Sequence, residues 1–191
     1  METITISEIL PGYILFLNGK KKLAKNIKFF QRLKYGKNGY WFLNHVGFFV
    51  KNMLGDWLVY EQDAPGRFGC NRFDTEYLKD KEDVYIGIPK ITLTDEGMHG
   101  LIQDAEMLAG QDCLLNYSYK SFIGFIFNSI YYKLFNREFW ITGKPKGSTC
   151  SQVTAFLYQN NFDMFLQKDW WTYFPNEIAD SEELIIKKLI Y

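Results

Sequence analysis

The segment KGSTCSQVTAFLY, residues 146–158, places a cysteine where a turn rich in glycine and hydroxyl residues changes to an apolar pattern of helical spacing. Ser148 or Thr149 can cap the predicted helix, which leaves Cys150 in its first turn. There the helix dipole and the free backbone N–H groups favour a thiolate over a thiol. The position suits a nucleophile, and it equally suits a small residue buried in the core.

A thiolate nucleophile needs a base, and the sequence contains two histidines. His99 lies between two glycines in TDEGMHGLIQ, residues 94–103, and is interpreted as structural or exposed. His45 begins the apolar segment HVGFF, where two-residue alternation puts His45, Gly47 and Phe49 on one strand face. We expect Gly47 to leave room beside the imidazole for a substrate or for the helix of the nucleophile.

A catalytic histidine also needs a third group that fixes its tautomer. The segments at 44–52 and 56–62 are rich in β-branched and aromatic residues and predict a hairpin. One register sets Glu61 opposite His45, and a register one residue longer sets Gln62 there, so the sequence leaves both open. A carboxylate stabilises an imidazolium better than an amide does, which favours Glu61.

The other expected elements place the fold in the α+β class, because strands come first and helices follow instead of alternating with them. The 191 residues are expected to form a single domain, residues 1–191. The expected elements are a strand within 11–18, a basic amphipathic helix at about 20–35, a strand at 82–90, a helix at 94–110, an apolar helical insertion at about 118–140, and a short closing element at the C-terminus.

Four segments, in this order, resemble a known family: LPGYILF, NHVGFFV, WLVYEQ and GSTCSQVTAFLY. The family is the circularly permuted branch of the NlpC-type papain-like superfamily, the YaeF/YiiX-like permuted amidases. The resemblance implies a papain-like α+β fold with a small antiparallel sheet or barrel packed on helices. It also implies that the catalytic histidine lies on a strand and that the cysteine follows it, at a helix N-terminus.

Carried over by position, the resemblance implies Cys150 as nucleophile, His45 as base and Glu61 as the orienting residue. Tyr117, in LLNYSY, resembles a tyrosine that the family places near the cleft. The sequence departs from the family pattern at Tyr13, where aspartate is usual, and at Gln152, where glutamate is common.

The chemistry expected from these residues is acyl transfer through a thioester on the cysteine. The first hypothesis is a cysteine amidase or peptidase that cleaves a small peptide-like amide, for example a cell-wall fragment. The second is a thiol acyltransferase or lipid hydrolase with the same residues, and the third is a binding module without catalysis. Gln62 and Arg67 are candidates for substrate contacts, although charges in the 63–73 loop are also typical of a solvated surface.

Composition argues against several classes of partner and cofactor. Lysine plus arginine equals aspartate plus glutamate at 22 each, so no overall field attracts nucleic acid. Three cysteines without CxxC spacing and two histidines make a poor metal set, and we expect neither a metal nor another cofactor.

Location and membrane contact are predicted from the apolar segments. METITISEIL has no basic region of the signal-peptide type, and residues 121–132 are too short to span a bilayer, so we expect a cytoplasmic protein. Residues 20–37 carry eight basic side chains and no acid. With the insertion they could hold the protein at an anionic membrane, but a solvated helix face and a core insertion fit the same pattern.

Overall fold

A computed structural model describes residues 1–62, 66, 68–79, 81–110, 118–140 and 148–190. The elements follow one another in the order β1 (Thr3–Thr5), η1 (Ile6–Glu8), β2 (Ile14–Gly19), α1 (Lys22–Tyr35), β3 (His45–Lys51), β4 (Trp57–Gln62), β5 (Phe68–Arg72), α2 (Thr75–Leu78), β6 (Lys81–Pro89), α3 (Asp95–Gly110), α4 (Tyr119–Phe135), α5 (Cys150–Phe162), η2 (Trp170–Thr172), α6 (Pro175–Ala179) and β7 (Leu184–Ile190).

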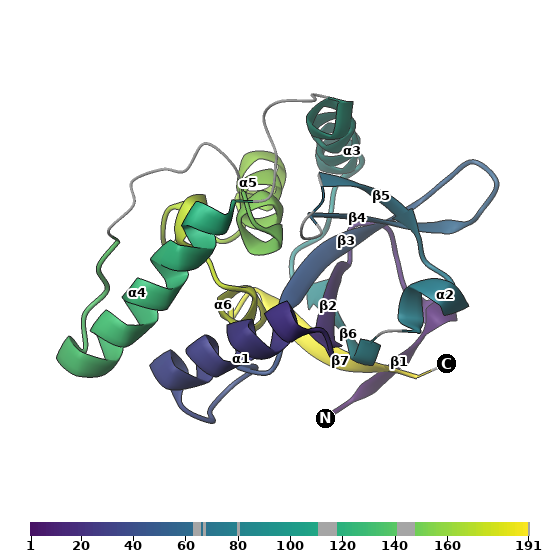
Figure 1. Cartoon of the computed structure of the whole chain (residues 1–191). Coiled ribbons are helices and arrows are strands. Elements are labelled where there is room, and N and C mark those ends of the chain that lie inside the picture. Colours follow the sequence, from purple (N-terminus) through teal and green to yellow (C-terminus); the bar gives the residue numbers. More distant parts are fainter. Residues whose placement is uncertain (63–65, 67, 80, 111–117, 141–147, 191) are drawn as a thin grey trace.

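The strands of the described chain form one seven-stranded sheet in the order β1-β7-β6-β2-β3-β4-β5. Neighbouring strands are antiparallel, apart from the parallel pair β1 and β7. Helices α1, α4, α5 and α6 gather on one side of the sheet, and the short helix α2 lies near its other face (Figure 1). The fold is therefore mixed α+β, as the element order predicted.

Strand β2 shows why the centre of the sheet is apolar throughout. Ile14 and Phe16 pack into the cluster beneath α5, whereas Leu15 and Leu17 pack into a second cluster on the opposite face. All four side chains are at most 2% exposed. Because both faces of the strand are covered, its sequence lacks the alternation of a half-exposed strand.

Several predicted helices are confirmed, and local sequence explains their ends. Helix α1 ends at Gly36, whose φ of 74° is in the left-handed region that glycine tolerates. Helix α3 begins after Thr94, whose Oγ1 accepts a hydrogen bond of 3.1 Å from the Gly97 N–H. Helix α4 is shorter than the predicted insertion, because Asn136 takes the left-handed conformation and ends it.

The sheet is larger and more open than the predicted small sheet or barrel. Its edge strands β1 and β5 stand at opposite ends of the strand order. Strand β5 forms in the segment that we expected to run as a loop, where it pairs with β4. The closing element is strand β7, which joins β6 to β1 at the other edge. Pairings between such distant segments leave no local pattern in a single sequence.

Candidate active site

Cys150 is the first residue of α5, and its surroundings hold the start of this helix firmly. The Thr149 N–H donates to Gln152 Oε1 at 2.9 Å, and the Gln152 amide donates to the Trp171 carbonyl at 2.5 Å. A glutamine therefore supplies the acceptor that a glutamate would supply, and adds a donor. The Cys150 residue is 5% exposed.

The pairing of β3 with β4 brings Glu61 to the imidazole by a register that we did not predict. The structure pairs Gly47 with Glu61 and Lys51 with Trp57, so Glu61 stands opposite Gly47 instead of His45. The loop between the strands is longer than the predicted one, because the Asn52 side chain accepts from the backbone of the loop. The displacement is two residues, which keeps Glu61 on the same face as His45.

Gly47 has a different role from the one that we expected. A Cβ atom at this position would lie 2.7 Å from the Tyr60 carbonyl oxygen and 3.0 Å from the Glu61 Cβ. The space beside Gly47 is thus filled by β4 and not left for a substrate or for α5. Glycine allows the close approach of β4 that carries Glu61 to the imidazole.

His45 links the carboxylate to the thiol. His45 Nε2 lies 2.5 Å from Glu61 Oε2, and Cys150 is near enough to the imidazole to affect its pKa. With Nε2 engaged by the carboxylate, Nδ1 is the ring nitrogen left for the thiol. Burial alone would lower the pKa of His45, but Cys150 and Glu61 beside it raise this pKa well above its usual value. The arrangement favours an imidazolium.

A carboxylate cluster, which we define as Glu61, Asn71 and Tyr77, supports the imidazole from behind. The Asn71 amide donates to Glu61 Oε1 at 2.9 Å, and the Tyr77 hydroxyl donates to Glu61 Oε2 at 2.8 Å. Burial alone would raise the pKa of Glu61, but His45, Tyr77 and Asn71 hold it below its usual value. The carboxylate is therefore ionised and has little freedom to turn away from His45.

Sequence reasoning missed both Asn71 and Tyr77. Asn71 pairs with Val59, two residues from Glu61 along β4, and such diagonal neighbours share a face of the sheet. The signal for Asn71 was therefore present once β5 was recognised as a strand. Tyr77 lies on the four-residue helix α2, and no local pattern connects it with Glu61.

The residues predicted to contact substrate are less well supported. Gln62 is 1% exposed, and its amide donates to the Gly66 carbonyl at 2.9 Å, so the structure pairs Glu61 and not Gln62 with His45. The Gln62 Oε1 is buried, and none of the described residues forms a hydrogen bond with it. Tyr117 and Arg67 lie outside the described residues, as does Cys113.

Two other interpretations agree with the structure. His99 is exposed on α3, away from the apolar face of that helix. The Arg72 side chain is 66% exposed and lies 3.4 Å from Asp56, as expected of a solvated surface charge.

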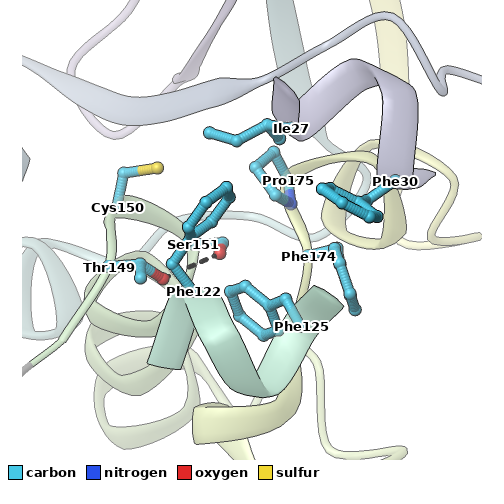
Figure 2. A pocket seen from close by; sticks show the side chains of 9 residues that line it. All are labelled: Ile27, Phe30, Phe122, Phe125, Thr149, Cys150, Ser151, Phe174 and Pro175. Atoms are coloured by element: carbon cyan, nitrogen blue, oxygen red, sulfur yellow. Dashed lines mark hydrogen bonds between the residues drawn. The ribbon is translucent and has the colours of Figure 1, made fainter. Parts of the chain in front are cut away.

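A second region, the apolar pocket, opens on the other side of the cysteine (Figure 2). In Figure 2 the Cys150 sulfur points toward the space between Ile27 and Phe122. The cavity itself is small, about 20 Å³, and it opens into a wider recess of about 340 Å³ that includes open solvent. It is lined by Ile27 and Phe30 of α1, Phe122 and Phe125 of α4, Thr149, Cys150 and Ser151 at the start of α5, and Phe174 and Pro175.

An ionic network supports the wall of this pocket from beneath. The Lys34 Nζ lies 2.7 Å from Glu138 Oε1 and 3.3 Å from Glu177 Oε1. The Lys168 Nζ lies 2.6 Å from Glu177 Oε2, which also accepts the Phe174 N–H at 2.7 Å. These contacts connect three parts of the chain around the Phe174 ring: helix α1, helix α6 and the segment that follows α4.

Fold and site together describe a mixed α+β protein in which a strand begins with histidine and a later helix begins with cysteine. No family model matches the sequence, and no curated protein matches it. Among solved structures, the chain is similar to the metalloprotein YiiX from Escherichia coli O157:H7, at 16% identity and a TM-score of 0.59. The match covers 92% of this chain and 94% of that chain. It confirms the predicted resemblance to YiiX at the level of the fold.

YiiX is a metalloprotein, but the donor atoms of the described residues of this chain do not meet the needs of a metal ion. Within the described ranges, no group of three or more histidine, cysteine, aspartate or glutamate side chains is arranged to hold one. His45 Nε2 is already engaged by Glu61. These residues do not fit a metal site, and the chemistry below uses the side chains of the chain alone.

Proposed function

We propose that this protein is a cysteine hydrolase that forms a thioester on Cys150, with His45 as base and Glu61 as the orienting residue. The observation that carries the proposal is the grouping of three side chains: Cys150 at a helix N-terminus, His45 near it, and Glu61 bonded to His45 Nε2. The likeness in fold to YiiX supports a permuted papain-like arrangement by analogy.

The proposed reaction begins with transfer of the thiol proton to His45. The Cys150 sulfur attacks the carbonyl carbon, and the electron pair of the C=O bond moves onto oxygen. The tetrahedral intermediate collapses, the bond to the leaving group breaks, and His45 returns its proton to the leaving nitrogen or oxygen. His45 then removes a proton from water, which attacks the thioester and releases the carboxylic acid and the thiol.

Two features of the site lower the barrier for these steps. The N–H groups in the first turn of α5, that of Cys150 among them, lack partners within the helix and can donate to the oxyanion. The Glu61 carboxylate stabilises the imidazolium that forms when the thiol loses its proton. Asn71 and Tyr77 keep that carboxylate in place.

The bond that is cleaved belongs to the proposal as well. The family resemblance favours a small peptide-like amide as substrate, and an ester or thioester would react by the same steps. The apolar pocket favours an apolar acyl group, which is the second hypothesis from the sequence.

The test is acylation of the protein by a panel of p-nitrophenyl esters and aminoacyl p-nitroanilides, followed by intact mass and peptide mapping. We expect an adduct on Cys150 that is absent from the Cys150→Ala variant. The matched control is Cys70→Ala, because Cys70 is an exposed cysteine that forms no disulfide. Adducts confined to Cys70, or product release unchanged in Cys150→Ala, would refute the proposal.

A further inference from the structure

We propose that the apolar pocket binds the acyl part of the substrate, and that this part is an apolar alkyl chain. The inference rests on the proposed function and gives that function a substrate class. Apart from Thr149, Cys150 and Ser151, every side chain that lines the pocket is a hydrocarbon. Among the described residues, no charged side chain lines it.

The side-chain hydroxyls at the pocket are already engaged. The Ser151 hydroxyl donates to the Tyr173 carbonyl at 2.7 Å, and Thr149 Oγ1 lies 3.3 Å from Ser151 Oγ. A peptide group or a charged side chain in the pocket would lose its hydration without gaining hydrogen bonds. A methylene group would gain about 0.8 kcal/mol on burial there. The lining therefore selects for alkyl groups and against polar ones.

The position of His45 indicates which half of the substrate enters. His45 delivers the proton to the leaving group, so the leaving group lies on the His45 side of the thiol. His45 is not among the lining residues of the pocket. The pocket thus remains for the group that stays bonded to the sulfur in the thioester, which is the acyl chain.

The walls of the pocket are held in place before any ligand binds. The Phe125 ring packs against Phe174 with centroids 4.2 Å apart and against Trp140 at 5.3 Å. Lys34 of the ionic network lies 4.9 Å from the centre of the Phe174 ring. A preformed site loses less side-chain freedom on binding than one that must be ordered by its ligand.

The test measures kcat/KM for acetyl, hexanoyl, decanoyl and palmitoyl p-nitrophenyl thioesters. We expect kcat/KM to rise about fourfold per methylene until the pocket is full, the equivalent of about 0.8 kcal/mol each. Ile27→Trp, which narrows the pocket beside the sulfur, should lower the decanoyl-to-acetyl ratio at least tenfold. Phe122→Ala should move the preference toward the longer chain. Ile91→Trp, the same type of change at an exposed site, should leave the ratio as it is.

A separate readout distinguishes this inference from the proposed function. Decanamide should bind saturably to the Cys150→Ala variant in calorimetry, and more weakly once Ile27→Trp is added. If no donor acylates Cys150 but decanamide binds in this way, the reaction is wrong and the pocket assignment stands. If acylation occurs at rates independent of chain length, or decanamide does not bind, the pocket assignment is overturned.

A different observation carries a second proposal: we infer that α4 lies on an anionic lipid membrane. One face of this helix carries an apolar stripe, formed by Tyr119, Ile123, Phe127, Ile130 and Leu134, whose exposed fractions run from 40% to 69%. The spacing of three and four residues puts these side chains in a row.

The opposite face of α4 makes the stripe unusual. The side that packs into the protein contains Ser121, Gly124, Asn128 and Ser129 besides Phe125. The helix thus turns small and polar residues inward and large apolar residues outward, which is the reverse of a surface helix in water. Exposed apolar rows of this extent mark an interaction surface.

The charges around the stripe indicate an anionic partner. Residues 119–137 and 20–37 contain basic side chains and no acid. A groove between α4 and α1 is lined by Phe29, Arg32, Leu33 and Lys133, so exposed cations and an exposed ring stand beside the stripe. Apolar side chains bordered by cations suit the headgroup region of an anionic bilayer. Among the described helices, none is long and apolar enough to cross a bilayer.

Vesicle sedimentation tests this second proposal. We expect the full chain to bind vesicles of phosphatidylglycerol and phosphatidylcholine, to bind phosphatidylcholine alone at least tenfold less, and to dissociate at high salt. Phe127→Glu should abolish binding, and Lys120→Glu with Lys133→Glu should weaken it. Ile91→Glu is the matched control at an exposed apolar residue outside the stripe. The proposal is overturned if the wild-type protein does not bind vesicles and instead forms dimers that Phe127→Glu dissociates. That result would show that a second copy of the chain covers the stripe.

Discussion

The two regions on either side of Cys150 differ in almost every property. Toward the sheet, His45 and the carboxylate cluster are joined by hydrogen bonds and carry charge. Toward α1 and α4, the described residues that line the apolar pocket have hydrocarbon side chains, apart from Thr149, Cys150 and Ser151. Under the proposed function, the contrast assigns proton transfer and substrate binding to different parts of the chain. The following variants alter one region at a time.

The largest effect is expected from the charged region, through His45→Ala. Loss of the base should reduce acylation of Cys150 by about 10³-fold to 10⁴-fold, because the thiol loses the proposed acceptor of its proton. The measurement is the rate constant for acylation by a p-nitrophenyl thioester. His99→Ala removes the chain's other histidine, which is exposed on α3, and should retain the full rate. Equal losses in the two variants would contradict the assignment of the base.

Glu177→Gln should have the next largest effect, on the support of the apolar region. Removing one partner from the buried network leaves Lys34 and Lys168 without their shared carboxylate, which costs about 3–5 kcal/mol of unfolding free energy. Urea unfolding at neutral pH measures the loss. Glu2→Gln, at a residue whose ion pair is exposed, should change the unfolding free energy by less than about 1 kcal/mol.

The same network gives the wild type a dependence on acid. Burial alone would raise the pKa of Glu177, but Lys168 and Lys34 hold it below its usual value. Because its pKa is lowered in the folded state, the Glu177 carboxylate stabilises the fold at pH values above the pKa of glutamate in the unfolded chain, about 4.3. This stabilisation is lost as the pH falls through the pKa of Glu177 in the folded state. Glu177→Gln should lose less stability over that range. An equal acid dependence in both proteins would remove Glu177 as its source.

Glu61→Gln should have a smaller effect on activity than the loss of the base. The uncharged amide supports an imidazolium less well, and we expect kcat/KM to fall about a hundredfold, or about 2.7 kcal/mol. Because Glu61 helps to raise the pKa of His45, the alkaline limb of the pH profile should move to lower pH in the variant. A profile that keeps the wild-type limb would show that Glu61 acts only in packing.

Tyr77→Phe should give the smallest change. The ring and its contact with Lys81 remain, and Glu61 loses one hydrogen bond, worth about 1–2 kcal/mol for a charged acceptor. We expect kcat/KM to fall several-fold. The alkaline limb of the pH profile should move to lower pH, as in Glu61→Gln, but by a smaller amount. Tyr131→Phe, a matched loss of a hydroxyl on α4, should leave the limb in place.

The sequence was informative where function depends on local pattern. Cys150 at a helix start, His45 at a strand start and Glu61 near the end of the next strand were all deduced from short segments. The register that joins them was wrong by two residues. Glu61 nevertheless reaches His45, because the side-chain alternation of a strand is unchanged by an even displacement.

The apolar pocket could not be predicted because its walls come from segments that are distant in sequence. Ile27 of α1, Phe122 of α4 and Phe174 near α6 each fit an ordinary apolar pattern. The sequence left the insertion open between core and membrane contact. In the structure its helix lines the pocket on one face and carries an exposed apolar stripe on the other. Helix packing decides which face is which, and a single sequence does not record it.

The separation of α1 and α4 from strands β3 to β5 has a consequence for how such a protein can diversify. Substitutions at Ile27, Phe30 or Phe122 change the shape of the apolar pocket without touching His45 or Glu61. Under the proposed function, a lineage can therefore exchange one acyl preference for another while its reaction stays the same. Under this proposal, α1 and α4 determine the acyl preference, and the strands that carry His45 and Glu61 determine the reaction. Exchanging both helices between homologues would then transfer the acyl preference in one step.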